Sequence, residues 1–217
     1  MKILNVKQGT EEWLDARLGL VTASELDALI SPTWKIRTGD GPRTYLYRKV
    51  AEAFLCKTIY GGGAFAMEQG TLLEPEARPW FELTYDCEVQ TAGFIVGDDN
   101  RCGCSPDGLI IGEKRGLELK CPQEIAAVRY AIEGELPEQY QMQVHGSMFV
   151  TGYDRWTFLS YHRTLPKFAI TVERREDRMD TIRQALSEFC ERFDEAFEKL
   201  NKSADEPRKN PFLPSKL

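Results

Sequence analysis

Ser105-Pro106-Asp107-Gly108-Leu109 and Gly116-Leu117-Glu118-Leu119-Lys120 are the two stretches that decide the fold of this 217-residue chain. Between them, residues 112–116 combine two glycines with three charged side chains, as in an exposed turn. The two stretches are therefore predicted to form an antiparallel hairpin. Such a hairpin brings the carboxylate of Asp107, at the start of its first strand, toward Glu118 on the second.

The second stretch also sorts its side chains by face. Successive residues of a strand point to opposite sides, so Glu118 and Lys120 share one face and the two leucines beside them enter a core. The hairpin therefore predicts that two carboxylates and one ammonium group converge.

This combination is typical of a metal-dependent phosphodiester nuclease. Mg²⁺ or Mn²⁺ neutralises the phosphate, lowers the pKa of a bound water and orients the attack. Asp107, Glu118 and a backbone carbonyl between Glu118 and Lys120 offer the oxygen ligands that such a hard cation prefers. Lys120 would place positive charge where negative charge develops during the reaction. The alternative is a surface hairpin with a chance salt bridge, because an acid two residues before a lysine is common.

Motifs elsewhere in the chain extend the pattern. Asp107, Glu118 and Lys120 resemble the three motif positions of the PD-(D/E)xK nuclease superfamily. Other segments resemble the lambda exonuclease and YqaJ-type viral recombinase family, in family order between residues 10 and 161. They are residues 13–25, a G-x-x-x-E-x-x-A-R helix at 70–78, Tyr140-Gln141-Met142-Gln143-Val144 and Ser147-Met148. The resemblance implies an α/β (α+β) fold with a restriction-endonuclease-like core, in which helices flank a central mixed sheet.

The resemblance also implies an activity. Family members are expected to be Mg²⁺-dependent 5'-to-3' exonucleases that digest one strand of double-stranded DNA from its ends. They leave 3' single-stranded overhangs for recombination by strand annealing. Two Mg²⁺ per active site are expected, with Mn²⁺ as a substitute. The implied assembly is a homotrimeric ring threaded by DNA, and the implied partner is a single-strand annealing recombinase.

Roles at the metal site follow from the same resemblance. Glu74, Asp107 and Glu118 fall on the metal and active-site acids of the family. The backbone carbonyl of Leu119 falls on a further metal ligand, and Lys120 falls on the catalytic lysine.

Two further groups of residues border this site in the family. Tyr140 and Gln143 fall on a helix beside it, where a phenol and an amide can hydrogen-bond to water or phosphate. Arg17, Ser24 and Ser105 fall on a pocket for the 5'-terminal phosphate. A planar guanidinium group and a hydroxyl at a helix start both suit that anion.

Several of these residues have structural alternatives. Ser24 could be only a helix N-cap, and either Glu74 or Glu76 could be solvated surface. Gln143 could simply satisfy buried backbone groups. Trp34, in a loop that lies near DNA in the family, could wedge or stack against bases, but such an aromatic residue more often packs on its own domain.

Composition fits one globular domain, with 42% hydrophobic and 29% charged residues. We expect a nuclease domain over residues 1–202 and an extended tail over 203–217. The net charge of −6 opposes DNA binding in sum, but a ring needs only a basic inner channel. The basic candidates are Lys35, Arg37, Arg43, Arg48 and Lys49.

The six cysteines contain no C-x-x-C pair, and the chain shows no signal peptide or long apolar run. We therefore expect reduced thiols in a cytoplasmic protein of a bacterial host, with no membrane association. Cys102 and Cys104 could bind a soft metal, but with only two histidines in the chain a structural role is favoured.

Periodicity predicts the elements of secondary structure. Helices are expected from Thr10 and over 23–30, 45–57, 64–85, 123–133, 137–150 and 177–201. Strands are expected over 88–96, 105–111, 116–121, 154–161 and 167–173. Residues 31–43 are expected to form a mobile loop. The apolar stripe of the last helix indicates core or subunit interface, and the tail that follows is a candidate brace for a neighbouring subunit.

Two other functions remain open. An endonuclease of the restriction or repair kind would share the three core residues without requiring a pocket for an end phosphate. A non-catalytic DNA-end binding module is the second alternative, against which the intact Asp107, Glu118 and Lys120 argue.

Overall fold

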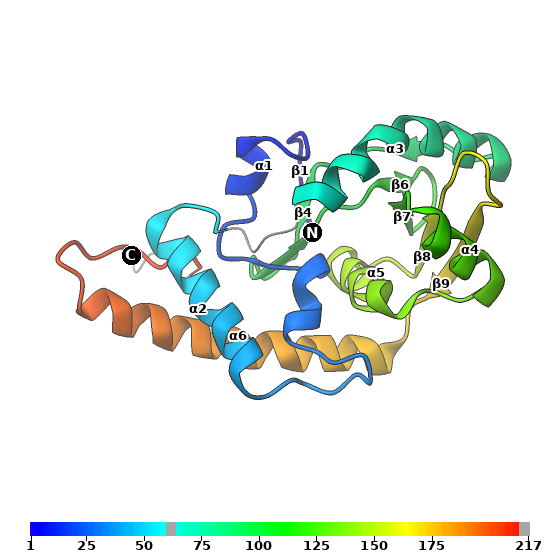
Figure 1. Cartoon of the computed structure of the whole chain (residues 1–217). Coiled ribbons are helices and arrows are strands. Elements are labelled where there is room, and N and C mark those ends of the chain that lie inside the picture. The colour runs from blue at the N-terminus through cyan, green and yellow to red at the C-terminus, as the bar shows by residue number, and fades with distance from the viewer. Residues whose placement is uncertain (60–63, 213–217) are drawn as a thin grey trace.

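The protein is described by a computed structural model that covers residues 1–59 and 64–212, with the side chains of residues 64–72 left out. Gly70 in the G-x-x-x-E-x-x-A-R motif and Pro214 in the tail therefore lie outside the described side chains. The described chain is a mixed α/β fold with two sheets and surrounding helices (Figure 1). No helix within the described ranges is long and apolar enough to cross a bilayer.

A five-stranded sheet forms the centre of the fold. Its order is β3 (Val89–Gln90), β6 (Gly108–Ile110), β7 (Arg115–Lys120), β8 (Arg155–Ser160) and β9 (Phe168–Glu173). β7 and β8 are parallel, whereas the other neighbouring pairs are antiparallel. The predicted hairpin of β6 and β7 is confirmed, and the sheet is mixed as expected.

A smaller sheet has the order β1 (Lys2–Leu4), β4 (Phe94–Val96), β5 (Cys102–Cys104) and β2 (Val21–Thr22). The prediction of one strand over 88–96 was wrong, because the chain divides there between the two sheets. Gly93 marks the break, since a Cβ atom at this position would lie 1.8 Å from the carbonyl oxygen of Val6. β1, β2 and β5 were not predicted, because strands of two or three residues show no readable alternation.

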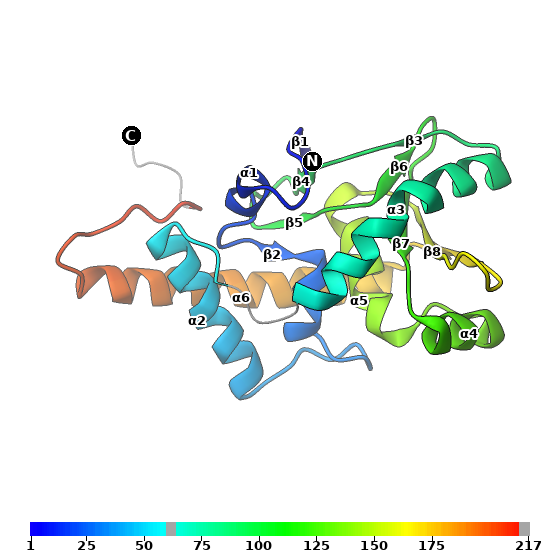
Figure 2. The same cartoon turned by 45° about the horizontal axis from the view of Figure 1, so that its top comes forward.

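The helices lie around the sheets, and Figure 2 shows α3 and α4 beside the strands β6 to β8. They are α1 (Glu11–Asp15), the 3₁₀ helix η1 (Ala23–Ala28), α2 (Asp40–Leu55), α3 (Ala64–Tyr85), α4 (Glu124–Glu133), α5 (Glu138–Thr151) and α6 (Glu176–Lys202). α2 begins five residues earlier than predicted. Pro42 is compatible with this start, because a first-turn N–H group has no partner within a helix. The predicted loop over 31–43 is thus shorter.

The apolar stripe of α6 belongs to the core of this chain. Phe189, Phe193 and Phe197 are buried. The ring of Phe189 packs on Tyr45 of α2 and that of Phe197 on Phe54 of α2. The tail that follows α6 turns back, so that the Phe212 ring meets Phe193 with their centroids 5.3 Å apart. The described part of the tail therefore braces its own chain, and a contact with a neighbouring subunit stays a prediction.

Candidate active site

The segment before β6 joins Asp107 to the centre of the sheet. The Asp107 amide donates to the carbonyl of Leu117 at 3.1 Å, and the Leu119 amide donates to Oδ2 of Asp107 at 2.6 Å. Beyond the end of β6, the Asp107 carboxylate thus accepts the hydrogen bond from β7 that a backbone carbonyl would accept within the sheet. Strand alternation and the turn between the strands predicted that Asp107 would approach β7, and the structure shows this contact.

Glu118 and Lys120 lie on the same face of β7, as predicted. Lys120 Nζ lies 2.5 Å from Oε1 of Glu118, and Gln143 of α5 donates to the same oxygen at 2.6 Å. Glu118 is only 1% exposed. Gln143 therefore contacts the buried carboxylate of Glu118 rather than a backbone group.

Helix α3 contributes from the other side of the segment. Arg78 donates to the backbone carbonyl of Asp107 at 2.9 Å, and Glu74 lies four residues earlier, on the same helix face. Burial, followed by the charge of Asp107, raises the pKa of Glu74. Glu76 is exposed instead and forms an ion pair with Arg163. The structure thus places Glu74 with the site and Glu76 on the surface.

The clustered carboxylates repel one another. Burial raises the pKa of Glu118 to about 7, and the charges of Asp107 and Glu74 add to this shift while Lys120 opposes it. Burial also raises the pKa of Asp107. Burial alone would lower the pKa of Lys120, but Glu118 and Asp107 hold it above its usual value. The site thus combines a firmly charged ammonium with carboxylates whose negative charge is only partly compensated.

The donors at this site suit a hard divalent cation, although no three described His, Cys, Asp or Glu side chains form a ready cage. Oε2 of Glu118 is buried and has no hydrogen-bond partner in the described part of the chain. The N–H and C=O groups of a strand residue point to the same side, so the Leu119 carbonyl faces Asp107, as its amide does. A buried carboxylate oxygen without a hydrogen-bond partner is stabilised by binding a proton or a cation. The neighbouring oxygens, of Asp107 and the Leu119 carbonyl, are ligands that Mg²⁺ prefers.

Tyr140 lies one helical turn before Gln143 on α5 and borders the same site. Its ring stacks on Phe158 with centroids 5.0 Å apart, and Lys120 Nζ lies 5.5 Å from the ring centroid. Tyr140 thus lies within a cation–π distance of the candidate catalytic lysine.

Two of the three predicted phosphate ligands come together. Arg17 donates from Nη1 to Oγ of Ser105 at 3.4 Å. Ser24 is exposed in η1, and its hydroxyl lies 3.2 Å from that of Thr22. The N-cap of η1 is Thr22, so the alternative that Ser24 is only a cap does not apply.

One of the DNA-contact candidates, Trp34, lies beside α5. Trp34 packs edge-on against His145 with centroids 5.0 Å apart, and the guanidinium of Arg178 lies 4.2 Å from the Trp34 ring. Trp34 therefore packs on its own domain in this structure, and a wedge role would require its release. Lys35 and Arg43 are exposed, and their contacts with DNA remain predictions.

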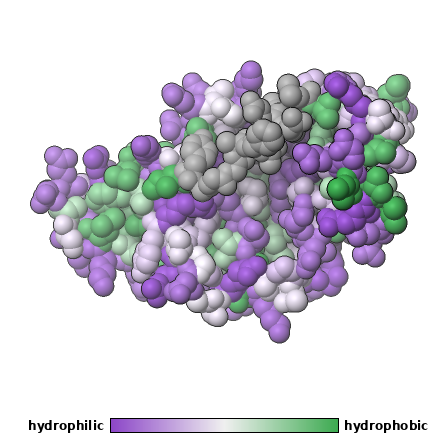
Figure 3. All heavy atoms as spheres, viewed as in Figure 1, coloured by the Kyte–Doolittle hydropathy of each residue, from purple (hydrophilic) through white to green (hydrophobic). Residues whose placement is uncertain are grey.

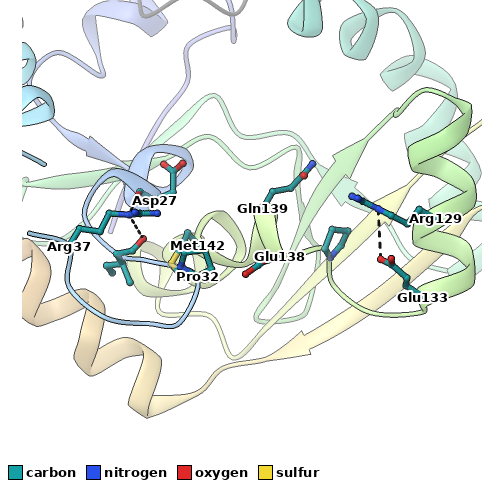
Figure 4. Close-up of a pocket in the computed structure, with 10 residues that line it drawn as sticks. Asp27, Pro32, Arg37, Arg129, Glu133, Glu138, Gln139 and Met142 are labelled. Carbon is teal, nitrogen blue, oxygen red and sulfur yellow. Dashed lines mark hydrogen bonds and ion pairs between the residues drawn. The ribbon is translucent and has the colours of Figure 1, made fainter. Parts of the chain in front are cut away.

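Arg37 lines a cavity of about 470 Å³ beside the start of α5 (Figure 4). Its Nε donates to the backbone carbonyl of Asp27 at 2.7 Å. Arg129 and Glu133 of α4 line the opposite side. The guanidinium of Arg37 thus lies on one wall of a hollow with mixed charge.

Two other basic candidates serve an internal network. Lys49 is 3% exposed and lies 2.9 Å from Glu25 and 3.1 Å from Glu52. Arg48 pairs with Glu25 at 2.6 Å. The prediction that Lys49 could line a channel was wrong, because its charge is buried between two carboxylates.

Three residues with a place in the site had no role assigned from sequence. Arg78 supports Asp107, Trp13 donates to Ser105 at 2.8 Å, and Gln8 donates to the Pro106 carbonyl at 3.0 Å. The spacing of Arg78 from Glu74 on one helix was a usable signal. Gln8 and Trp13 gave none, because no local pattern joins residues so distant in sequence.

The cysteines are all free thiols. Cys102 and Cys104 are buried in β5, and burial raises the pKa of both thiols. Thiols held in the protonated form are poor metal ligands and weak nucleophiles.

Comparison with known proteins identifies the family of the chain. A family model described as the YqaJ-like viral recombinase domain matches residues 12–154, most of the chain. The chain belongs to the YqaJ-like viral recombinase family. The family match includes Arg17, the acids of the site and the Tyr140–Gln143 helix. No match was found among curated proteins.

Solved structures give the same fold. LHK-Exo in complex with dAMP is 28% identical, with a TM-score of 0.79, covering 89% of this chain and 97% of that one. The alkaline exonuclease LHK-Exo from Laribacter hongkongensis is 27% identical, with the same TM-score and coverage. A phage-related exonuclease from Haemophilus somnus 129PT, 14% identical with a TM-score of 0.66, covers 83% and 96% and shares the fold. The expected PD-(D/E)xK fold is confirmed.

Proposed function

We propose that this protein is a Mg²⁺-dependent exonuclease that digests one strand of duplex DNA from phosphorylated 5' ends and leaves 3' overhangs. One observation carries the proposal. Ser105 contacts Arg17, and Asp107, only two residues later, contacts β7 beside Glu118 and Lys120. Ser105, which can hold an end phosphate, is thus only two residues from Asp107, one of the candidate catalytic carboxylates.

The residues that would hold Mg²⁺ are Asp107, Glu118, the Leu119 carbonyl and Glu74. When bound, the cation supplies Lewis-acid stabilisation of the phosphate and lowers the pKa of a water, with Mn²⁺ able to substitute. Lys120 stays protonated and stabilises negative charge that develops on the phosphate.

Gln143 and Tyr140 complete the chemistry on the α5 side of the site. Gln143 holds Glu118 through its amide, and the Tyr140 hydroxyl can orient water or phosphate by hydrogen bonding. Water attacks the phosphorus atom and the P–O3' bond breaks. The shortened strand therefore carries a new 5' phosphate, which suits the next round.

The test uses linear duplexes labelled on each strand, with 5'-phosphate or 5'-hydroxyl ends. With Mg²⁺, the labelled 5'-phosphorylated strand should shorten from its 5' end, the hydroxyl end should react more slowly, and EDTA should stop both reactions. Equal rates at both kinds of end would contradict the end-phosphate part of the proposal. Cutting of closed circles would favour the endonuclease alternative.

Lys120→Ala tests the catalytic assignment. We expect digestion to fall by roughly 10²–10³-fold, the loss typical when one stabilising donor is removed from an active site. Lys114→Ala, in the exposed turn after β6, is the matched control and should retain activity. Binding of duplex DNA and the circular dichroism spectrum verify that the Lys120 variant is folded. Unchanged metal-dependent digestion would show that the catalytic assignment of Lys120 is wrong, whereas a wild type that binds duplex ends without digesting them would favour the non-catalytic alternative.

We further propose that the chain works as a homotrimeric ring in the bacterial cytoplasm and passes its overhang to a single-strand annealing recombinase. Exposed apolar side chains on α4 support assembly, since Ile125 is 88% and Ile132 78% exposed. Hydrophobic groups gather over α4 on the face in Figure 3, and apolar patches of this kind often mark interaction sites. Light scattering that reports a monomer with and without DNA would overturn the ring.

A further inference from the structure

One indole contacts two of the three residues predicted to bind the end phosphate. Trp13 lies on α1 and is 8% exposed. Its Nε1–H donates to Oγ of Ser105 at 2.8 Å, and the guanidinium of Arg17 lies over its ring at 4.1 Å from the centroid. Trp13 therefore fixes the position of both groups relative to each other.

These contacts determine how Ser105 can interact with a ligand. A serine hydroxyl has one hydrogen to donate and two lone pairs that accept. An indole N–H and a guanidinium can only donate, so Trp13 and Arg17 both direct hydrogens at the Ser105 oxygen. The hydrogen of the Ser105 hydroxyl takes no part in these two contacts and can be donated to a ligand. Ser105 is thus set as a hydrogen-bond donor.

Two neighbouring hydrogen-bond donors favour one class of ligand. The Ser105 hydroxyl and the Arg17 guanidinium both present hydrogens, and Arg17 adds positive charge. An ionised phosphate monoester accepts at several oxygens and donates from none, so it matches this set. A 5'-hydroxyl end carries a hydrogen of its own and no charge, so it matches poorly.

We infer that Trp13 is a positioning residue that makes Ser105 an obligate donor and thereby sets the preference for phosphorylated 5' ends. The inference rests on the proposed exonuclease function and deepens it. It assigns the specificity to a residue that does not itself have to touch the DNA.

The surroundings hold Trp13 and Ser105 in register. Thr10 caps α1, and its side chain accepts from the Trp13 backbone amide. Trp13 also packs with Phe94 of the smaller sheet. On the other side, Gln8 donates to the Pro106 carbonyl at 3.0 Å. Because the indole is also part of a small core, its removal by alanine would confuse packing with specificity.

Trp13→Phe is the informative change, since it keeps an aromatic ring for packing and for Arg17 but removes the N–H. The measurement is kcat/KM for duplexes with 5'-phosphate and 5'-hydroxyl ends. We expect the ratio of the two values to fall by about tenfold, the usual worth of one hydrogen bond in such a comparison. The kcat on hydroxyl ends should stay unchanged. Trp80→Phe, the same change on α3, is the matched control and should keep the wild-type ratio.

Ser105→Ala gives a second route if Trp13→Phe folds poorly. It removes the donor itself, so it should lower the ratio at least as much, and adding Trp13→Phe should lower it no further. A wild-type ratio in Trp13→Phe, or fully additive losses in the double variant, would overturn the inference while leaving the exonuclease proposal intact. A wild-type enzyme without any end preference would instead refute the end-phosphate part of the proposed function, and the inference with it.

Discussion

His145 lies on α5 behind the candidate site and is 5% exposed. Its Nδ1 is buried without a hydrogen-bond partner in the described ranges. Burial, and then the charges of Arg178 and Arg175, lower the pKa of His145 to about 4, although Asp177 opposes the shift. The folded chain therefore keeps this imidazole neutral in mildly acidic solution.

This shift predicts a loss of stability in acid. An unfolded chain binds the histidine proton near pH 6.5, so between pH 6.5 and 4 the unfolded state binds more protons than the folded state. The contribution of His145 is fully present above pH 6.5 and is lost as the pH falls toward 4, by up to about 3 kcal/mol.

Urea unfolding of the wild type and His145→Gln at pH 7.5, 6 and 5 measures the effect. The free energy of unfolding should fall less steeply with acid in the variant. Parallel pH profiles for the two proteins would contradict the assignment.

Some residues of the site could be predicted from local sequence patterns, and others could not. Asp107, Glu118 and Lys120 followed from strand alternation and a turn, because both rules act over a few residues. Trp13 could not be given its role from sequence, since its partner Ser105 is distant along the chain and the contact depends on how α1 packs. Local patterns specify side-chain direction, whereas tertiary packing specifies such partners.

At the scale of the element, β7 depends on a glycine. A Cβ atom at Gly116 would lie 2.3–2.5 Å from ring atoms of Trp156 on β8, and Trp156 is fully buried. The ring lacks room to move within a close-packed interior. The strand that carries Glu118 and Lys120 therefore requires a residue without a side chain here.

Gly116→Ala should destabilise the protein by about 1–3 kcal/mol or more, as overpacking of a core does. Digestion should also fall, because β7 must shift to relieve the contact. Urea unfolding and the nuclease assay measure the two effects. Gly41→Ala in α2 is the control, since a Cβ atom there meets nothing within 4 Å. Equal urea midpoints for Gly116→Ala and Gly41→Ala would show that β8 can move away from the added methyl group without loss of stability.

The elements themselves were predicted unevenly. The long helix α6 shows enough periods of an apolar stripe to be read from sequence. Residues 88–96 were read as one strand because their composition is continuous, and the division at Gly93 depends on the approach of Val6. Only the tertiary structure contains that contact.

At the scale of the molecule, the tail joins the end of the described chain to its beginning. Asn210 donates to Asp194 at 2.9 Å, and Phe212 lies beneath the guanidinium of Arg101, 5.2 Å from the ring centroid. Phe212 also lies against Gly19, close in sequence to Arg17. Residues of the predicted tail thus contact the domain predicted over 1–202.

Phe212→Ala should lower the free energy of unfolding, by less than the roughly 3–5 kcal/mol of a fully buried phenylalanine, because this ring is half-buried. Thermal unfolding measures the loss. Leu83→Ala, at a side chain 86% exposed, is the control and should change little. A Phe212 variant as stable as the Leu83 variant would show that the tail only rests on the surface.

The connection of Ser105 to Asp107 has a consequence for the product of the proposed exonuclease. Two residue steps of extended chain span at most about 7 Å, and stacked nucleotides rise about 3.4 Å along a strand. For the proposed exonuclease we therefore expect the attacked bond to lie one or two nucleotides from the end phosphate. The length of the protein segment, rather than the bases of the DNA, would then set the size of each released fragment.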